Sequence, residues 1–148
     1  MAKIHKRKKF FDVDIPIINK QTQLHAFDIK ELEGRDLKYD LTRLLKGKNI
    51  LLRSKVIVKE EEATSIPVEI EILPSFLMRV VRKGTDYVED SFSAKCKDAE
   101  LKIKPLLVTR AKVSKRIRKI LRERAKKELI EYVKSKNSEE IFEEVLKI

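Results

Sequence analysis

The sequence predicts an α+β fold, with a small antiparallel β-barrel-like core, a short inserted helix and one or two C-terminal helices. Three observations predict it. Apolar and polar residues alternate over several stretches before residue 73 and again between 88 and 103, as they do in half-buried strands. A proline and apolar residues at helical spacing follow residue 73. Beyond residue 111 the chain lacks glycine and proline and is rich in helix-favouring residues.

The first half of the chain is expected to form strands. Residues 11 to 17 alternate but contain a proline, which has no N–H to donate to a neighbour, so an edge strand is expected. Residues 37 to 41 repeat the period of two, and residues 49 to 58 form the strongest predicted strand. Its partner is expected at 66 to 72, with the acidic and small residues from 60 to 65 as a solvated connection.

A short helix and a hairpin are expected next. Pro74 suits the first turn of a helix, where its missing N–H is not needed, and Gly84 is expected to end that helix. Residues 88 to 103 alternate on both sides of Lys97-Asp98. This pattern predicts a hairpin that turns at Lys97-Asp98.

The remainder of the chain is expected to be helical from about Lys112, with Asn137 or Ser138 as the cap between two helices. No linker, repeat or low-complexity segment divides the chain. We therefore expect a basic tail at 1–9 and one domain at 10–148.

Charge dominates the composition. The chain has 35 lysines and arginines against 24 acidic residues, a net charge of +11. Such an excess attracts polyanions, either nucleic acid or an anionic membrane. The membrane is the weaker alternative, because no apolar run approaches about 18 residues and no signal-peptide core follows the N-terminus. Cys96 is the single cysteine and cannot form an intrachain disulfide or a multi-thiolate zinc site, so a soluble, cytoplasmic protein is expected.

Residues 110 to 127 carry ten basic side chains against Glu123 alone. On a helix, four apolar residues of this segment share one face: Val113, Ile117, Ile120 and Leu121. Five basic residues gather opposite: Lys115, Arg118, Lys119, Arg122 and Lys126. Like charges at this spacing repel one another unless an anion joins them, and phosphate suits that role. The alternative is a solvated helix face balanced by glutamates.

Two further basic groups are visible. The tail carries five basic residues, expected to order on RNA or else to act as a disordered solubilising arm: Lys3, Lys6, Arg7, Lys8 and Lys9. Near the short helix a smaller group is either ordinary surface charge or an RNA contact: Arg79, Arg82 and Lys83. The expected RNA-binding residues are these two groups together with Arg110, Lys112, Lys115, Arg116, Arg118, Lys119, Arg122 and Lys126.

Enzyme signatures are not found. The sequence has no glycine-rich phosphate loop, nucleophile elbow or metal-binding histidine pair, and His25 is expected on a surface strand. We expect no catalysis, metal or cofactor. The alternative is a metal-dependent nuclease that uses carboxylates such as Asp12 and Asp14, or those between Asp86 and Asp90, and incubation with RNA and Mg²⁺ tests it.

Base stacking is not the expected mode of RNA binding. The chain has six phenylalanines, three tyrosines and no tryptophan, and Phe76 and Phe92 are expected in the core. No exposed aromatic platform for single strands is therefore predicted. Contacts to the backbone and shape of structured RNA are expected instead.

Lys104–Ala111 and Lys115–Glu123 resemble the archaeal and eukaryotic small-subunit ribosomal protein family S-three-a, also called e-S-one. Phe76–Lys83 with Thr85 looks like that family's helix and basic segment, and Lys97-Asp98 looks like its hairpin turn. Weaker matches lie at Lys8–Phe11, Pro16 and Gly34-Arg35. The resemblance spans nearly the whole chain in order and is most specific from 74 to 125.

The resemblance implies a β-barrel-like core flanked by helices, bound to ribosomal RNA on the small-subunit platform, close to where messenger RNA leaves. It implies that eight residues face RNA: Arg79, Arg82, Arg110, Lys115, Arg116, Arg118, Lys119 and Arg122. Family members are usually longer at the C-terminus, so this chain resembles a shortened member. Gly84 stands where a basic residue is common and Phe10 where a tryptophan is expected, so contacts at these two positions are not carried over.

The leading hypothesis is a structural constituent of the small ribosomal subunit, bound to its RNA and in contact with neighbouring ribosomal proteins of the platform and with messenger RNA near its exit. The alternative is a free-standing nucleic-acid-binding regulator or architectural protein. Comparing binding to ribosomal RNA fragments with binding to unrelated duplex DNA separates the two.

Overall fold

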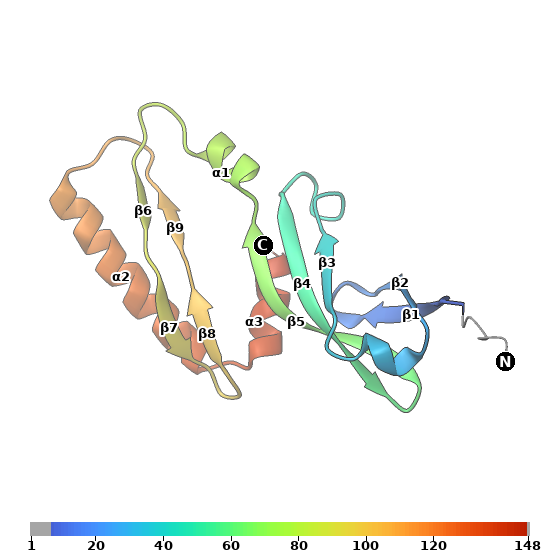
Figure 1. Cartoon of the computed structure of the whole chain (residues 1–148). Helices are drawn as coiled ribbons and strands as arrows, with labels where there is room; N and C mark the ends of the chain where they lie inside the picture. Colours follow the sequence, from blue (N-terminus) through green and yellow to red (C-terminus); the bar gives the residue numbers. More distant parts are fainter. Residues whose placement is uncertain (1–6, 148) are drawn as a thin grey trace, which may run out of the picture. The chain divides into compact units, whose positions relative to one another are not determined.

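The computed structural model describes residues 7 to 147. The chain forms two compact units, Met1–Ile72 and Leu73–Ile148 (Figure 1). Five strands and two short 3-10 turns build the first unit, whereas the second combines three α-helices with a two-stranded ribbon. The α+β class is confirmed. The expectation of one domain from 10 to 148 stays a prediction.

The first unit is a curled five-stranded sheet, a half-barrel (Figure 1). Its strands are β1 (Lys9–Ile15), β2 (Lys20–Ala26), β3 (Asp36–Asp40), β4 (Ile50–Lys59) and β5 (Glu62–Ile72), with η1 (Pro16–Ile18) and η2 (Ile29–Leu32) between them. In space they follow the order β2-β1-β5-β4-β3. All neighbours are antiparallel except β1 and β5, which run parallel where Val13 lies opposite Ala63. No tight turn joins these two distant segments, so nothing local imposes the expected antiparallel direction.

The first strand differs from its prediction in length and position. β1 ends at Ile15 because Pro16 begins η1, where its fixed φ and missing N–H are tolerated. The strand lies inside the sheet, and β2, which the sequence did not predict, takes the edge. The apolar alternation of β2 is weak, since Leu24 is its only large aliphatic residue. His25 is exposed on β2, as expected.

The strand predicted at 49 to 58 is confirmed as β4, and Ile50, Leu52 and Val56 are buried. The prediction of a loop from 60 to 65 is wrong. The turn consists of two glutamates with positive φ, and β5 begins at Glu62. A β-bulge opposite Arg53 then shifts the register. Before the bulge, Ala63 and Ser65 face the core, while Ile66 and Val68 are exposed.

The second unit contains a ribbon and three helices. Its elements are α1 (Pro74–Val80), β6 (Tyr87–Glu89), β7 (Phe92–Lys95), β8 (Glu100–Ile103), β9 (Leu106–Val108), α2 (Lys115–Lys134) and α3 (Ser138–Lys147). β7 pairs with β8 and β6 with β9, both antiparallel, so the hairpin predicted around Lys97-Asp98 is confirmed and extends to Val108. α1 is shorter than expected, ending before the loop in which Gly84 has φ +93°.

The core of the second unit lies between α2 and the ribbon, which run side by side in Figure 1. Phe92 and Ala94 of β7 are buried against Val133 of α2, and the half-buried Leu129 and Ile141 pack around them. Burying apolar side chains of this size stabilises a fold by roughly 1.5 to 3 kcal/mol each. Packing therefore fixes α2 on the ribbon.

Asp98, in the hairpin turn, holds the start of α3. Its carboxylate accepts hydrogen bonds from the Ser138 hydroxyl at 2.7 Å and the Ser138 N–H at 2.9 Å. Asn137 occupies the N-cap position, because its carbonyl accepts from Ile141 and its N–H donates to Glu140. One of the two expected caps is thus confirmed. The Ser138 hydroxyl, followed by its N–H and the Cys96 thiol, lowers the pKa of Asp98 to about 2.

Acid should weaken the attachment of α3. Because the folded pKa of Asp98 lies below its ordinary value of 3.8, its contribution to stability is present above about pH 4 and is lost as the pH falls towards 2. We expect Asp98→Asn to lower the melting temperature at pH 6 and to converge with the wild type near pH 2. Ser138→Ala should reduce the same pH dependence. If the melting temperatures of Asp98→Asn and the wild type differed by the same amount at every pH between 6 and 2, this role would be contradicted.

Candidate nucleic-acid interface

One end of the second unit is closed by Asp86 and Thr109, which extend the β6–β9 pairing by one step. The Thr109 N–H donates to the Asp86 carbonyl at 2.8 Å, and the Thr109 hydroxyl accepts the Asp86 N–H at 2.9 Å. The Asp86 carboxylate accepts the N–H of Val113 at 2.9 Å. These bonds hold the loop before β6 beside the loop that leads into α2.

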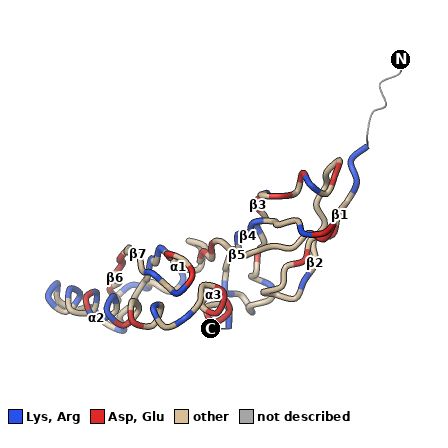
Figure 2. The backbone as a smooth tube through the Cα atoms, turned by 90° about the horizontal axis from the view of Figure 1, so that it is seen from below, with Lys and Arg blue, Asp and Glu red and all other residues tan. Residues whose placement is uncertain are grey.

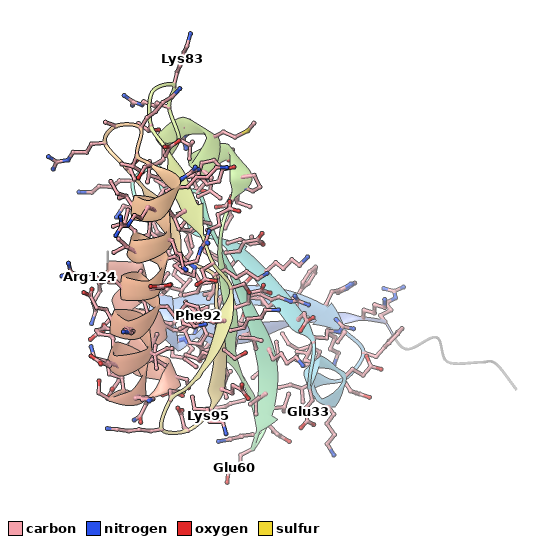
Figure 3. All side chains as sticks on the ribbon, turned by 90° about the vertical axis from the view of Figure 1, so that its left-hand side faces the viewer. Glu33, Glu60, Lys83, Phe92, Lys95 and Arg124 are labelled. Carbon is pink, nitrogen blue, oxygen red and sulfur yellow. The ribbon has the colours of Figure 1, made fainter. Side chains whose placement is uncertain are left out.

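Six basic residues extend from this end of the unit, and we call them the basic end: Arg82, Lys83, Arg110, Lys112, Lys115 and Arg116. All six are exposed, and none forms an ion pair with another residue of the described chain. Lys83 projects away from the body of the unit (Figure 3). Asp86 is the one acidic residue in these segments, and its carboxylate is bonded to a backbone N–H.

The start of α2 adds to the positive potential. Ser114 caps the helix by accepting the Ile117 N–H at 3.4 Å, and the first turn contains no acidic residue. Lys115 and Arg116 therefore stand at the positive end of the helix dipole, where cations are unfavourable by a few tenths of a kcal/mol each. An anion placed at the basic end would relieve this repulsion.

Along α2 the predicted division into an apolar and a cationic face is correct only in part: four of the five predicted cations are exposed, and Val113 and Leu121 are half-buried. Figure 2 shows lysine and arginine predominating along the helix, but Arg122 donates to the Glu89 carbonyl at 3.2 Å and the Lys126 ammonium lies 5.4 Å from the centre of the Phe92 ring. Ile117 and Ile120 are instead 46% and 54% exposed. The apolar residues beyond residue 128 set the rotation of the whole rigid helix, and the prediction considered only 110 to 127.

The repulsion along α2 is smaller than predicted. Lys119 lies 4.0 Å from Glu123, and Arg124 donates to Glu128 at 2.9 Å. Both pairs are well exposed and stabilise the helix by only a few tenths of a kcal/mol. Arg118 is half-buried. Of the five cations predicted to form the stripe, only Lys115 is exposed and makes no side-chain contact of these kinds with the described residues, so the stripe is not continuous.

The other predicted residues lie elsewhere. The Arg79 guanidinium is 5.6 Å from the centre of the Phe76 ring on α1. Lys3 and Lys6 fall outside the described residues, whereas the remaining basic residues of the tail are exposed in the first unit. Nothing in the sequence pattern relates the group at 82–83 to the group at 110–116. The pairing of β6 with β9 brings them together.

Sequence reasoning missed an exposed aromatic cluster in the first unit. Phe10 of β1 is 70% exposed and stacks on His25 of β2. The expectations from the sequence did not include this exposed ring. Two phenylalanines are adjacent in β1, and alternation places only Phe11 on the face of Val13 and Ile15, so Phe10 must face outward.

Three of the carboxylates considered for a nuclease form hydrogen bonds within the protein. Besides the Asp86 bond to Val113, Asp90 accepts the N–H of Ser91, and Asp12 accepts from the Gln23 amide at 2.9 Å. Among residues 7 to 147 no three His, Cys, Asp or Glu side chains are grouped closely enough to hold a metal ion. In the same range no helix has the length and apolarity needed to span a membrane.

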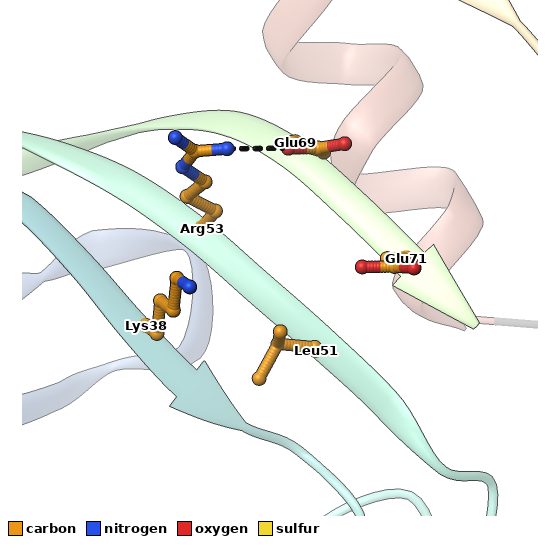
Figure 4. Close-up of a pocket in the computed structure, with 5 residues that line it drawn as sticks. All are labelled: Lys38, Leu51, Arg53, Glu69 and Glu71. Carbon is orange, nitrogen blue, oxygen red and sulfur yellow. Dashed lines mark hydrogen bonds and ion pairs between the residues drawn. The ribbon is translucent and has the colours of Figure 1, made fainter. Parts of the chain in front are cut away.

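A small pocket on the outer face of the first unit is lined mainly by charged side chains of the protein (Figure 4). Arg53 lies between Asp36 and Glu69, at 3.1 Å from each, and these hydrogen bonds raise the pKa of Arg53. Lys38, Leu51 and Glu71 complete the lining. Because Arg53 is already paired with Asp36 and Glu69, it offers no free charge to attract a charged ligand into the pocket.

The fold and the basic end define an α+β protein whose second unit carries a concentrated cationic surface. No model of a known protein family matches the sequence, and no curated protein matches it significantly.

Proposed function

We propose that this chain is a non-enzymatic structural constituent of the small ribosomal subunit that binds ribosomal RNA through the basic end and the N-terminal tail. The observation that carries the proposal is the basic end itself. Its six exposed cations come from two segments, 82–83 and 110–116, have no ion-pair partner within the described chain and are held together by the bonds between Asp86 and Thr109.

Phosphate binding accounts for this arrangement. Each lysine or arginine that neutralises a phosphate releases condensed counterions, and each arginine adds a fork of N–H donors that fits two phosphate oxygens. The two segments are attached to a packed ribbon and helix, so the cations are held near one another before RNA arrives. The bound protein would reduce phosphate repulsion and let neighbouring RNA segments approach.

The resemblance to the S-three-a family supports the ribosomal setting. Of the eight residues for which it implies RNA contact, four lie in the basic end: Arg82, Arg110, Lys115 and Arg116. The other four lie outside it: Arg79 contacts Phe76, Arg118 is half-buried, Lys119 lies near Glu123, and Arg122 is bonded to the ribbon. We place the protein, by this resemblance, in the cytoplasm on the platform of the small subunit, close to the messenger RNA exit and to neighbouring ribosomal proteins.

Sedimentation of cell lysate tests this function. We expect the chain to sediment with small ribosomal subunits at low salt and to be released as the salt concentration rises. Recovery only in the soluble fraction would contradict a ribosomal role. If the purified protein also bound unrelated duplex DNA as tightly as ribosomal RNA fragments, a free-standing nucleic-acid-binding protein would be the better description.

A further inference from the structure

An aromatic column stands on the outer face of the β1–β2 hairpin. Phe10 and His25 are opposite one another in the strand register, with ring centroids 4.7 Å apart and planes inclined by 28°. His25 therefore covers one face of the Phe10 ring. At 70% exposure, the rest of that ring remains open to solvent.

A second aromatic residue and a cation lie one step further along the hairpin. Lys8 immediately precedes β1, which carries Phe10, and Phe27 immediately follows β2, which carries His25. The Lys8 ammonium is 5.3 Å from the centre of the Phe27 ring, which is 38% exposed. Together these four residues form the aromatic platform.

We propose that the aromatic platform is a stacking site for an unpaired base of single-stranded RNA. The base would extend the column of His25 and Phe10, and Lys8 would meet the adjacent phosphate. A flat ring stacks on the π-face of any base without regard to sequence. The inference deepens the proposed function, and it rests on that function only in taking RNA as the ligand.

The surroundings favour a base over an apolar protein partner. On the other side of Phe10 the outer face continues with Asp12 and Gln23, which are hydrogen-bonded to each other, so the aromatic patch ends in polar groups. Arg7 and Lys9, the exposed chain neighbours of Lys8, add positive charge at this end, but strand alternation directs Lys9 to the opposite face of the hairpin. Glu31 accepts the Phe27 N–H at 3.0 Å at the same end. Aromatic rings bordered by cations match the bases and phosphates of a single strand. The carboxylate of Asp12 would repel the phosphates of the strand, so they would lie at the end of the platform that carries Lys8.

The absence of tryptophan from the sequence provides a direct probe. Phe10→Trp places a single indole in the platform, and a stacked base should quench its fluorescence. We expect quenching by short oligoadenylate and none by an abasic ribose-phosphate chain of the same length and charge. Tyr132→Trp, which places the indole on α2 instead, is the matched control and should report no base-dependent quenching.

Affinity measurements provide the second test. Phe10→Ala and Phe10→Leu should each weaken oligoadenylate binding about tenfold, whereas Phe10→Tyr should bind like the wild type, because only the first two variants lose the π-face. Met78→Ala, which removes an exposed residue that is not aromatic, should have no effect. Equal quenching by the abasic chain, or unchanged affinity in Phe10→Ala, would overturn the stacking site.

The two proposals fail in different experiments. Loss of oligoadenylate binding in Phe10→Ala, together with absence of the protein from small subunits, would retain the stacking site and reject the ribosomal function. Unchanged oligoadenylate binding in Phe10→Ala, together with recovery of the protein in small subunits, would retain the ribosomal function and reject the stacking site.

Discussion

Raising the monovalent salt concentration from about 50 to about 200 mM should weaken the binding of this chain to structured ribosomal RNA by about 10³-fold. The six cations of the basic end can make up to about six phosphate contacts, and each contributes a slope of about −0.9 to the dependence of log affinity on log salt. If the N-terminal tail adds further contacts, the loss approaches about 10⁵-fold.

Filter binding or fluorescence anisotropy over a salt series measures this slope directly. Replacing chloride by glutamate at a constant cation concentration serves as a control, because release of cations from RNA should dominate the slope. A nearly flat salt dependence would contradict phosphate binding by the basic end. It would leave the exposed cations of the second unit without the role proposed for them.

Removing charge at the basic end should have the second large effect. The quadruple variant Arg82→Gln, Lys83→Gln, Arg110→Gln and Lys112→Gln removes four of the six cations. At about 100 mM salt we expect affinity for ribosomal RNA to fall on the order of 10²- to 10³-fold and the salt slope to become shallower by roughly one per residue. All four side chains are exposed, so the melting temperature should change little.

A matched variant separates position from net charge. Lys95→Gln, Lys97→Gln, Lys102→Gln and Lys134→Gln removes the same number of charges from exposed residues of the same unit. Lys95 and Lys83 lie at opposite ends of that unit (Figure 3). The matched variant should bind less than tenfold more weakly than the wild type. Equal losses in the two variants would show that net charge, rather than the basic end, governs binding.

Local patterns predicted several elements correctly because their cause is local. The alternation from 49 to 58 predicts β4, and Pro74 marks the first turn of α1. Lys97-Asp98 marks the turn between β7 and β8. β2 was missed because it has too few large apolar residues to show an alternating pattern. A strand of this kind is stabilised by hydrogen bonds to β1, which no local pattern reports.

The candidate site was only partly predictable. Composition identified the basic residues, but it could not show which of them face solvent. Arg122 and Lys126 are exposed, as the predicted stripe requires, but both also contact the ribbon, because packing around Val133 sets the rotation of α2. The exposure of Phe10 likewise depends on which of two adjacent phenylalanines faces the core.

By itself, the sequence determined the α+β class, the large cationic excess and the positions of the main breaks between elements, since composition, periodicity and turn chemistry act over a few neighbouring residues. Only the tertiary structure decided which cations stand together and which aromatic ring is exposed. Strand pairing brings Arg82 beside the segment that begins at Arg110, and burial of one helix face selects the residues left in water. Both depend on contacts between segments far apart in the chain, which local patterns do not encode.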